Sequence, residues 1–520
     1  MVLGGILART LPPLFRTNPA GIYYVSFTGS DDNAGVSREQ PFRTMQRAAD
    51  LVRPGERIVV LPGTYEERVH LRRGGTTQQK VVLEADVPGS VLLTWSHPLV
   101  GTWREEGDGI WSTPVQSPIY RLASEGETFF RVPWGGVAYM RKLVTKPNAW
   151  GAFWYDEPTS RLYLRRKYGA PPNQSEILVP RSAPGPREWG EFKSANLTIE
   201  AGHLEIRGLR MEFGIGAGVL LWDADDVTLS DCAFSEATCG VKGVGVLHEP
   251  KHIRIDRCLY HHYPQWNWHR DWLSWHEVYA AYSGCSLVGL TCDDTQIRDC
   301  VILHAGDGLQ WTTPSDAKIG AEASGNLIAY CTDDAVEFDG PASQIHFHDN
   351  VILDCHESLG VSPITHGPAL IERNLFYHPH VELNGAQVKL LGNDPRPGQE
   401  RATIANVEIR DNLAFGNWLC WWDVTPVRNV FVHDNRFTVR AVNDPVWPPG
   451  VREQDNLVTV DPELPKNIAT LDLLEQIQTN PEWQRILSGD CGPRWSSWKQ
   501  HPAVPDFAEL TKLKAKNTGN

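Results

Sequence analysis

The stretch that decides the fold is Ile345–Asn350, with the sequence IHFHDN, because related stretches recur along the chain. Each is a short run rich in β-branched residues that ends in a small polar pair: Val227–Cys232 (VTLSDC), Ile253–Cys258 (IRIDRC), Gln296–Cys300 (QIRDC), Leu370–Asn374 (LIERN), Val407–Asn412 (VEIRDN) and Val430–Asn435 (VFVHDN). With Asn326 from the weaker copy SGNLI, the last residues fall at 232, 258, 300, 326, 350, 374, 412 and 435. A base period of about 24 residues, interrupted twice by insertions, predicts one coil of a parallel β-helix per period.

This repeat predicts an all-β fold, a right-handed parallel β-helix. Equivalent positions of successive coils stack about 4.8 Å apart, so the Asn residues that end the later copies are expected to form a hydrogen-bonded ladder. We interpret this Cys and Asn column as architecture. A propeller would need a longer repeat of roughly forty residues.

The period also divides the chain. We expect an N-terminal arm at 1–21, the β-helix at 22–94 and 196–440, an inserted β-rich, sandwich-like subdomain at 95–195, and a C-terminal packing tail at 441–520 that covers the far end. Near the start, Met45, Ala48, Ala49 and Val52 follow helical spacing after Thr44, a plausible N-cap. This predicts a capping helix that plugs the open end of the core.

Composition narrows the partners. The formal net charge is −14, without a basic run, which argues against nucleic acid. No stretch approaches twenty apolar residues, so no membrane span is expected, and residues 1–20 make a poor signal peptide. Ten Cys without paired spacing indicate free thiols, which favours a cytoplasmic compartment over secretion. The 20 Trp suit a carbohydrate partner. Assembly into a homo-oligomer is left open.

Seven residues beyond the register marks, three consecutive coils each carry an acid: Asp307, Asp333 and Glu357. Asp334 follows directly, and Glu337 lies three residues further on. Stacked carboxylates repel one another, so such a column does not arise for stability. Catalysis is the favoured interpretation. Capping of turns and a calcium site are the alternatives, and we expect no cofactor and no metal.

The surroundings of the acids predict the remaining site residues. Four residues beyond the marks lie His304, Tyr330 and other polar groups, and the insertion between Cys258 and Cys300 is rich in Trp and His. The Trp residues near Trp418 and Trp421 add further aromatic surface. With Asp333 and Glu357 as the catalytic pair, the expected substrate-binding residues are Asp307, Asp334, Glu337, His304, Trp311, His356, His366 and Trp275.

Two resemblances sharpen these expectations. The stretch from Gly29 to Gly35 (GSDDNAG), the Pro-Phe-Arg-Thr segment at 41–44 and the PGTY turn at 62–65 resemble the opening of the pectate-lyase-like superfamily of β-helices. The acids, together with the early β-rich insertion, resemble glycoside hydrolase family 120, the β-xylosidase family. That resemblance implies an Asp nucleophile and a Glu acid/base on neighbouring coils, matched by Asp333 and Glu357, with Asp334 as the competing match for the nucleophile.

These features favour an exo-acting, retaining glycosidase that cleaves a neutral oligosaccharide or glycoside. Carboxylates on adjacent coils would be near the 5 to 5.5 Å of retaining enzymes, whereas inverting enzymes need about 6.5 to 9.5 Å. The runner-up is a polysaccharide lyase or uronate epimerase, which needs a basic residue; Lys389 and Arg373 are the nearest cations in sequence. A non-catalytic adhesion module is the third class.

Overall fold

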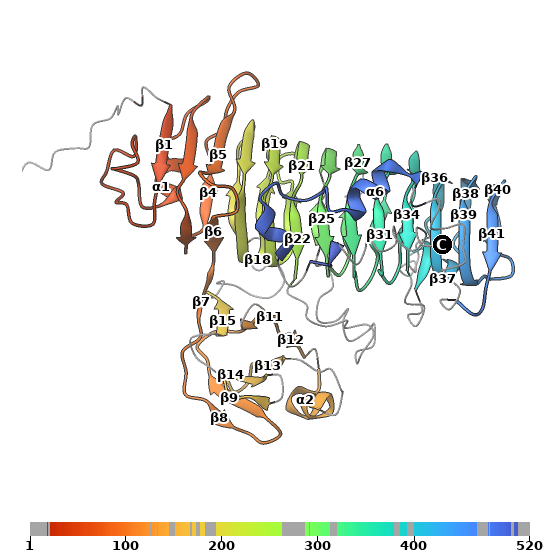
Figure 1. Cartoon of the computed structure of the whole chain (residues 1–520), viewed down its shortest axis with the longest axis horizontal. Helices are drawn as coiled ribbons and strands as arrows, with labels where there is room; N and C mark the ends of the chain where they lie inside the picture. Colours follow the sequence, from red (N-terminus) through yellow and green to blue (C-terminus); the bar gives the residue numbers. More distant parts are fainter. Residues whose placement is uncertain are drawn as a thin grey trace, which may run out of the picture.

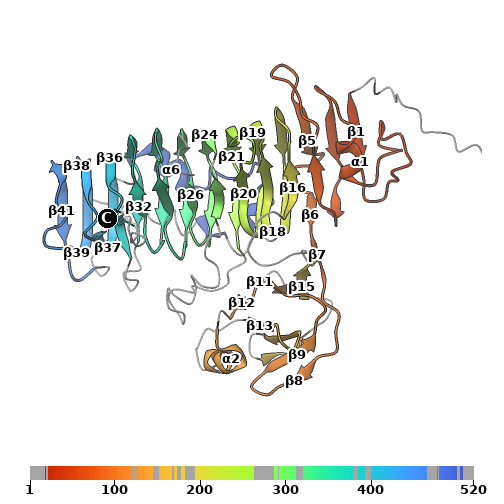
Figure 2. The ribbon, with the colours of Figure 1, turned by 180° about the vertical axis from the view of Figure 1, so that it is seen from behind.

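A computed structural model gives the fold. It describes residues 18, 21–119, 121–124, 127–132, 134–144, 151–166, 169–172, 177–181, 194–262, 286–290, 292–311, 320–378, 385–392, 400–464, 477, 479–500 and 504–507. Its main body is an elongated stack of β-coils, from which a smaller β-rich unit projects on one side (Figure 1, Figure 2). The parallel β-helix that the repeat predicted is confirmed.

One wall of the solenoid is a parallel sheet of 13 strands, which contains the repeated stretches. Its strands, in spatial order, are β1 (Ile22–Val25), β2 (Arg57–Val60), β5 (Val81–Ala85), β17 (Leu204–Arg207), β19 (Asp225–Ser230), β21 (Lys251–Asp256), β24 (Asp293–Arg298), β27 (Ala321–Ser324), β30 (Ile345–His348), β33 (Ala369–Glu372), β36 (Ile404–Arg410), β38 (Val427–His433) and β40 (Val451–Gln454). Within β30, Ile345 and Phe347 point into the core, and His346 and His348 alternate outward. This alternation is the one expected of a half-buried strand.

The other strands of the coils belong to a 19-stranded sheet. In the middle of the solenoid, β25 (Val301–Leu303), β28 (Leu327–Ala329), β31 (Val351–Leu353) and β34 (Leu375–Tyr377) stack in parallel. A second stack holds β26 (Leu309–Trp311), β29 (Val336–Gly340), β32 (Leu359–Ile364) and β35 (Ala386–Leu390). The remaining strands are β3 (Gly63–Tyr65), β4 (Val69–Leu71), β6 (Val91–Thr94), β16 (Ala195–Ile199), β18 (Leu209–Trp222), β20 (Ala233–Val244), β22 (Leu259–His261), β23 (Ser286–Leu290), β37 (Leu413–Trp422), β39 (Arg436–Ala441) and β41 (Leu457–Val460).

The Asn column forms the expected ladder. Asn326 Nδ2 donates to Asn350 Oδ1 at 2.9 Å, and Asn350 Nδ2 donates to Asn374 Oδ1 at 3.0 Å. The ladder continues through Asn412 and Asn435. Each rung satisfies polar groups that have no access to water, which is why a small amide recurs at this corner.

The β-rich unit interrupts the solenoid after β6. It contains two small sheets with antiparallel pairings, made of β7 (Ser96–Pro98), β8 (Arg104–Glu105), β9 (Ile110–Pro114), β10 (Ala123–Ser124), β11 (Glu127–Thr128), β12 (Phe130–Arg131), β13 (Ala152–Asp156), β14 (Arg161–Arg165) and β15 (Ile177–Pro180), and the helix α2 (Gly136–Val144). Phe153, Leu162 and Leu164 are buried in a separate core. The unit therefore folds around its own apolar residues.

A short helix lies at the start of the solenoid. In α1 (Met45–Ala49), Thr44 is the N-cap and its Oγ1 accepts a hydrogen bond from the Arg47 amide at 3.1 Å. Met45 and Ala48 are buried in the solenoid core. That α1 closes the end of the core stays a prediction.

The C-terminal segment differs from the expectation in two ways. The coils continue through β40 and β41, beyond residue 440. The described part of the tail, with α6 (Pro481–Leu487) and the 3-10 helix η3 (Ser496–Gln500), lies along the flank of the solenoid, where Trp483 Nε1 donates to the Arg373 carbonyl and Trp495 Nε1 to that of Asp231. It covers the apolar outer face of β25, β28, β31 and β34, whose outward residues would otherwise be exposed.

Two sequence expectations concern simple features. The nine Cys in the described segments are all buried, and none of them forms a disulfide bond. Among the helices that the structure describes, none combines the length and the apolar character needed to cross a membrane.

Candidate active site

The acids gather in the turns that link the two strand stacks of the 19-stranded sheet. Asp307 lies between β25 and β26, Asp333 and Asp334 lie between β28 and β29, and Glu357 lies between β31 and β32. Because these strands pair in parallel, the three turns follow one another along the solenoid. The coil repeat therefore brings carboxyl groups from distant sequence positions to one place.

The register corrects one detail of the sequence prediction. Asp334, and not Asp333, forms a bridge with Glu357, and the pairing of Leu309 with Val336 aligns Asp334 with Asp307. The strand β28 pairs with β31 at an interval of 24 residues, whereas β29 pairs with β32 at an interval of 23. The middle turn thus contains one extra residue. A count of seven from each mark assumes turns of equal length and so misses this insertion.

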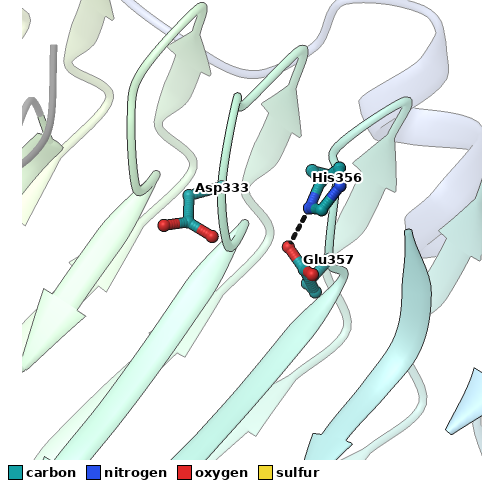
Figure 3. Close-up of side chains that lie close together, drawn as sticks. All are labelled: Asp333, His356 and Glu357. Atoms are coloured by element: carbon teal, nitrogen blue, oxygen red, sulfur yellow. Dashed lines mark hydrogen bonds and ion pairs between the residues drawn. The ribbon is translucent and has the colours of Figure 1, made fainter. Parts of the chain in front are cut away.

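The extra residue changes how the middle turn presents its side chains. Asp334 is fully buried, whereas Asp333 is partly exposed. Asp333, His356 and Glu357 each have a polar side-chain atom within 4.8 Å of the other two, and Figure 3 shows Asp333 and Glu357 on neighbouring coils. Asp307, Asp333 and Asp334 form a second group within the same limit. Asp333 belongs to both groups.

His356 holds Glu357 in place. Its Nδ1 lies 2.5 Å from Glu357 Oε2, and its ring is steeply inclined to that of Trp421, at an interplanar angle of 70° with centroids 5.6 Å apart. Glu357 is 2% exposed. The hydrogen bond in Figure 3 therefore fixes a carboxyl group that has little freedom to reorient.

The cation of the site is Lys389 on β35. Its Nζ forms an ion pair with Asp334 and lies 3.7 Å from Glu337 Oε1. Glu337 also accepts a hydrogen bond from Gln310 Nε2 at 3.1 Å. The sequence indicates Lys389 as one of the nearest cations but does not place it in the site, because the interval from β32 to β35 is 29 residues and breaks the 24-residue count. Arg373, the other cation, lies elsewhere and pairs with Asp349 and Glu372.

Burial and mutual repulsion raise the pKa values of Asp307, Asp333 and Asp334. Burial is the main cause for Asp307, whose pKa lies well above its ordinary value, with the charges of Asp333 and Glu337 adding to the effect. Burial also raises the pKa of Asp333 to about 6, against the opposing effect of Lys389. The pKa of Asp334 is raised mainly by burial, again opposed by Lys389. Asp333 can therefore exchange a proton near pH 6.

The pKa of Lys389 shifts in the direction that keeps its charge. Burial alone would lower it, but the charges of Asp334, Glu337, Asp333 and Glu357 outweigh burial and raise the pKa well above the ordinary value for lysine. Lys389 is thus a permanent cation in the middle of the acids. It neutralises part of a charge that would otherwise destabilise the fold.

Other predicted substrate-binding residues lie apart from this group. Trp311 is wrong as a binding residue, because it is fully buried in the solenoid core and stacks on Phe338 at 5.3 Å. In β26, Leu309 and Trp311 both point inward, and only Gln310 faces outward. Trp275 lies outside the described residues.

The two remaining histidines also have other surroundings. His304 shares a turn with Asp307, but its ring stacks on Tyr330 at 4.9 Å, and Tyr330 packs against the apolar cluster of the flank. His366 is exposed and comes after the C-terminal end of β32, whereas Glu357 comes just before the N-terminal end of that strand. The sequence could not separate these cases, since a His at the right interval can face either side of a turn.

Both carboxylate groups hold oxygen atoms close enough together to be ligands of one metal ion. Asp307 and Asp334 each have a buried Oδ1 without a hydrogen-bond partner, and hard oxygen ligands suit Ca²⁺. The ammonium of Lys389, however, already contacts Asp334 and Glu337. A divalent ion bound there would face this charge, so the donor set fits Ca²⁺ poorly.

Sequence comparisons give short matches. The model of a family described as a protein of unknown function (DUF1565) matches residues 27–71. YwoF of Bacillus subtilis (strain 168), an uncharacterised protein, is 40% identical over 99 residues, which are 19% of this chain and 18% of YwoF. The matched part is therefore less than a fifth of that relative.

Similar solved structures include a xylose complex, a lacto-N-biosidase and a polysaccharide lyase. The complex of XylC with xylose has a TM-score of 0.47 at 12% identity and covers 85% of this chain and 87% of that one. The lacto-N-biosidase of family GH136 from Eubacterium ramulus has a TM-score of 0.46 at 13% identity, with 85% and 68% covered. A mannuronic acid specific family 6 polysaccharide lyase from human gut microbiota has a TM-score of 0.45 at 10% identity, with 95% and 99% covered. By its own coils, the chain is a parallel β-helix protein with a carboxylate cluster on one face.

Proposed function

We propose that the chain is a glycoside hydrolase that cleaves a neutral glycoside with retention of anomeric configuration. The observation that carries the proposal is the pair Asp333 and Glu357, with carboxylate oxygens on adjacent coils within 4.8 Å of each other. Retaining enzymes hold their two carboxyl groups about 5 to 5.5 Å apart, whereas inverting enzymes leave room for a water molecule between them. The short separation supports a double displacement.

Asp333 is the proposed nucleophile. It is more exposed than Asp334, and with a pKa of about 6 it is mostly ionised at neutral pH. Its carboxylate forms a bond to the anomeric carbon while the bond to the leaving-group oxygen breaks. Asp334 is fully buried and paired with Lys389, so it is better placed to balance charge than to attack.

Glu357 is the proposed acid and base. It gives its proton to the leaving-group oxygen in the first step, and in the second step it takes a proton from the water that attacks the anomeric carbon and releases Asp333. His356 orients it through the hydrogen bond to Oε2. No step needs a metal ion, and we propose that none is required.

The elimination chemistry of a lyase is less well supported. A lyase needs a neutral base to remove a proton next to a uronate carboxylate. Lys389 is the cation within reach among the described residues, and the acids around it raise its pKa, which keeps it protonated. Four neighbouring acids would also repel a uronate. That the enzyme acts at chain ends stays a prediction, since the Trp-rich insertion near Trp275 lies outside the described residues.

A substrate screen tests the proposal. We expect release of nitrophenol from a neutral aryl glycoside, such as a 4-nitrophenyl xyloside, and no ultraviolet absorbance from uronate polymers. Asp333→Asn and Glu357→Gln should lower turnover, whereas Lys80→Met, which changes an ion pair with Asp226 on the other sheet, should not. If ultraviolet absorbance increased with a uronate polymer and no aryl glycoside released nitrophenol, the protein would be a lyase and the proposed hydrolase function would be wrong.

A further inference from the structure

A row of outward side chains runs beside the acids along the solenoid. It consists of Gln310, Glu337, Gly360, Lys389 and Trp421, each paired in register with the next across five coils. In parallel strands, paired residues point to the same face. The row therefore runs across successive coils, along the axis of the solenoid.

The two ends of this row differ in chemistry. At the N-terminal end, Gln310 Nε2 donates to Glu337 at 3.1 Å, so this end offers groups that hydrogen-bond to hydroxyls. At the C-terminal end, the partly exposed Trp421 offers an aromatic surface. Gly360 lies between them, and a Cβ there would come within 2.8 Å of the Asp334 carboxyl group. Only glycine leaves space for that carboxylate.

The catalytic pair gives the row a direction. Asp333 lies on the coil that precedes the coil of Glu357, so the proposed acid is nearer the C-terminal end of the row. Trp421 contacts His356, and His356 binds Glu357, so the aromatic surface is on the side of the acid. A general acid must lie beside the oxygen that departs with the leaving group.

We infer that Trp421 forms the leaving-group subsite, so that the glycone lies over Gln310 and Glu337 and the leaving group stacks on the indole. This inference rests on the proposed function. It gives the substrate one orientation, with its non-reducing end toward the N-terminal coils. It also predicts selection for leaving groups with an apolar or aromatic face.

The test compares 4-nitrophenyl and methyl glycosides of the sugar that the wild-type enzyme hydrolyses fastest. Trp421→Ala should lower kcat/KM for the nitrophenyl glycoside about tenfold more than for the methyl glycoside, as expected for loss of a stacking contact. Trp421→Phe should restore most of this difference. Gln310→Ala is the matched control, since a glycone contact should affect both substrates equally.

A second readout isolates the leaving-group subsite from folding. Once the glycosyl-enzyme has formed, the subsite is empty and can bind an acceptor alcohol. Trp421→Ala should therefore reduce transfer to benzyl alcohol relative to transfer to methanol. An equal loss with both glycosides, or an unchanged benzyl-to-methyl ratio, would overturn the inference while leaving the hydrolase intact. A wild-type protein that cleaves no glycoside would overturn the proposed function and the subsite with it.

Discussion

Substitution of Lys389 by Met should destabilise the protein in a way that depends on pH. The ammonium pairs with the fully buried Asp334 and lies 3.7 Å from Glu337. At an effective dielectric constant of about 20, one ion pair at such a distance is worth about 4 kcal/mol. Removal of one partner from a buried pair costs about 3–5 kcal/mol, because the other charge remains without compensation. We expect a loss of this size in the free energy of unfolding at pH 8.

The loss should shrink as the pH falls. Without the cation, the pKa values of Asp333 and Asp334 in the folded state rise further above their unfolded values. A carboxyl group with a raised folded pKa binds its proton more tightly in the folded state, so stability is lost as the pH rises through that pKa. Each unit of added shift costs about 1.4 kcal/mol at high pH, and nothing below the unfolded pKa.

Thermal unfolding between pH 5 and pH 8 measures this difference. Lys389→Met should approach the wild-type melting temperature at pH 5 and fall well below it at pH 8. Lys80→Met is the control, because its ion pair with Asp226, at 2.7 Å, is partly exposed and should contribute less than about 1 kcal/mol. A melting temperature lowered equally at both pH values would mean that Lys389 acts through packing, and the electrostatic account of the site would be refuted.

Three further predictions concern catalysis. Asp333→Asn should abolish turnover of all glycosides, whereas Glu357→Gln should slow substrates with poor leaving groups far more than activated aryl glycosides. Steady-state kinetics with a series of leaving groups will measure this difference. Equal losses in the two variants would contradict the assignment of Asp333 as nucleophile and Glu357 as acid and base. Because the nucleophile must be ionised and the pKa of Asp333 is about 6, kcat/KM should fall as the pH drops below about 6, and a flat profile down to pH 4.5 would exclude Asp333. Dialysis against EDTA should leave activity unchanged; loss that added Ca²⁺ restores would require a metal.

The sequence was sufficient for the fold because the solenoid repeats one physical unit. Each coil needs apolar residues at alternating positions and a small amide or thiol at one corner, and these appear at readable intervals such as Asn326, Asn350 and Asn374. Contacts that lie outside the repeat could not be predicted from the sequence. The tail residue Trp483 contacts the Arg373 carbonyl, 110 residues away, and no periodic signal marks such a contact.

The site was predictable only in part, because not all of its residues follow the 24-residue repeat. The acids of neighbouring coils could be aligned from the period, but the one-residue insertion at Asp333 could not, since it leaves the strands on either side unchanged in pattern. Lys389 follows a longer interval and so escaped the count. Trp311 is misplaced in the predicted site because its position on β26 alternates inward, and the residue type alone does not show which face of the strand it occupies.

The configuration of the first-formed product tests the central claim most directly. Proton NMR during hydrolysis of an aryl glycoside distinguishes the anomers before mutarotation equilibrates them. With the oxygens of Asp333 and Glu357 within 4.8 Å, we predict that the first sugar released has the same anomeric configuration as the substrate. Inversion at that carbon would contradict the double displacement by Asp333 and Glu357, whatever the variants show.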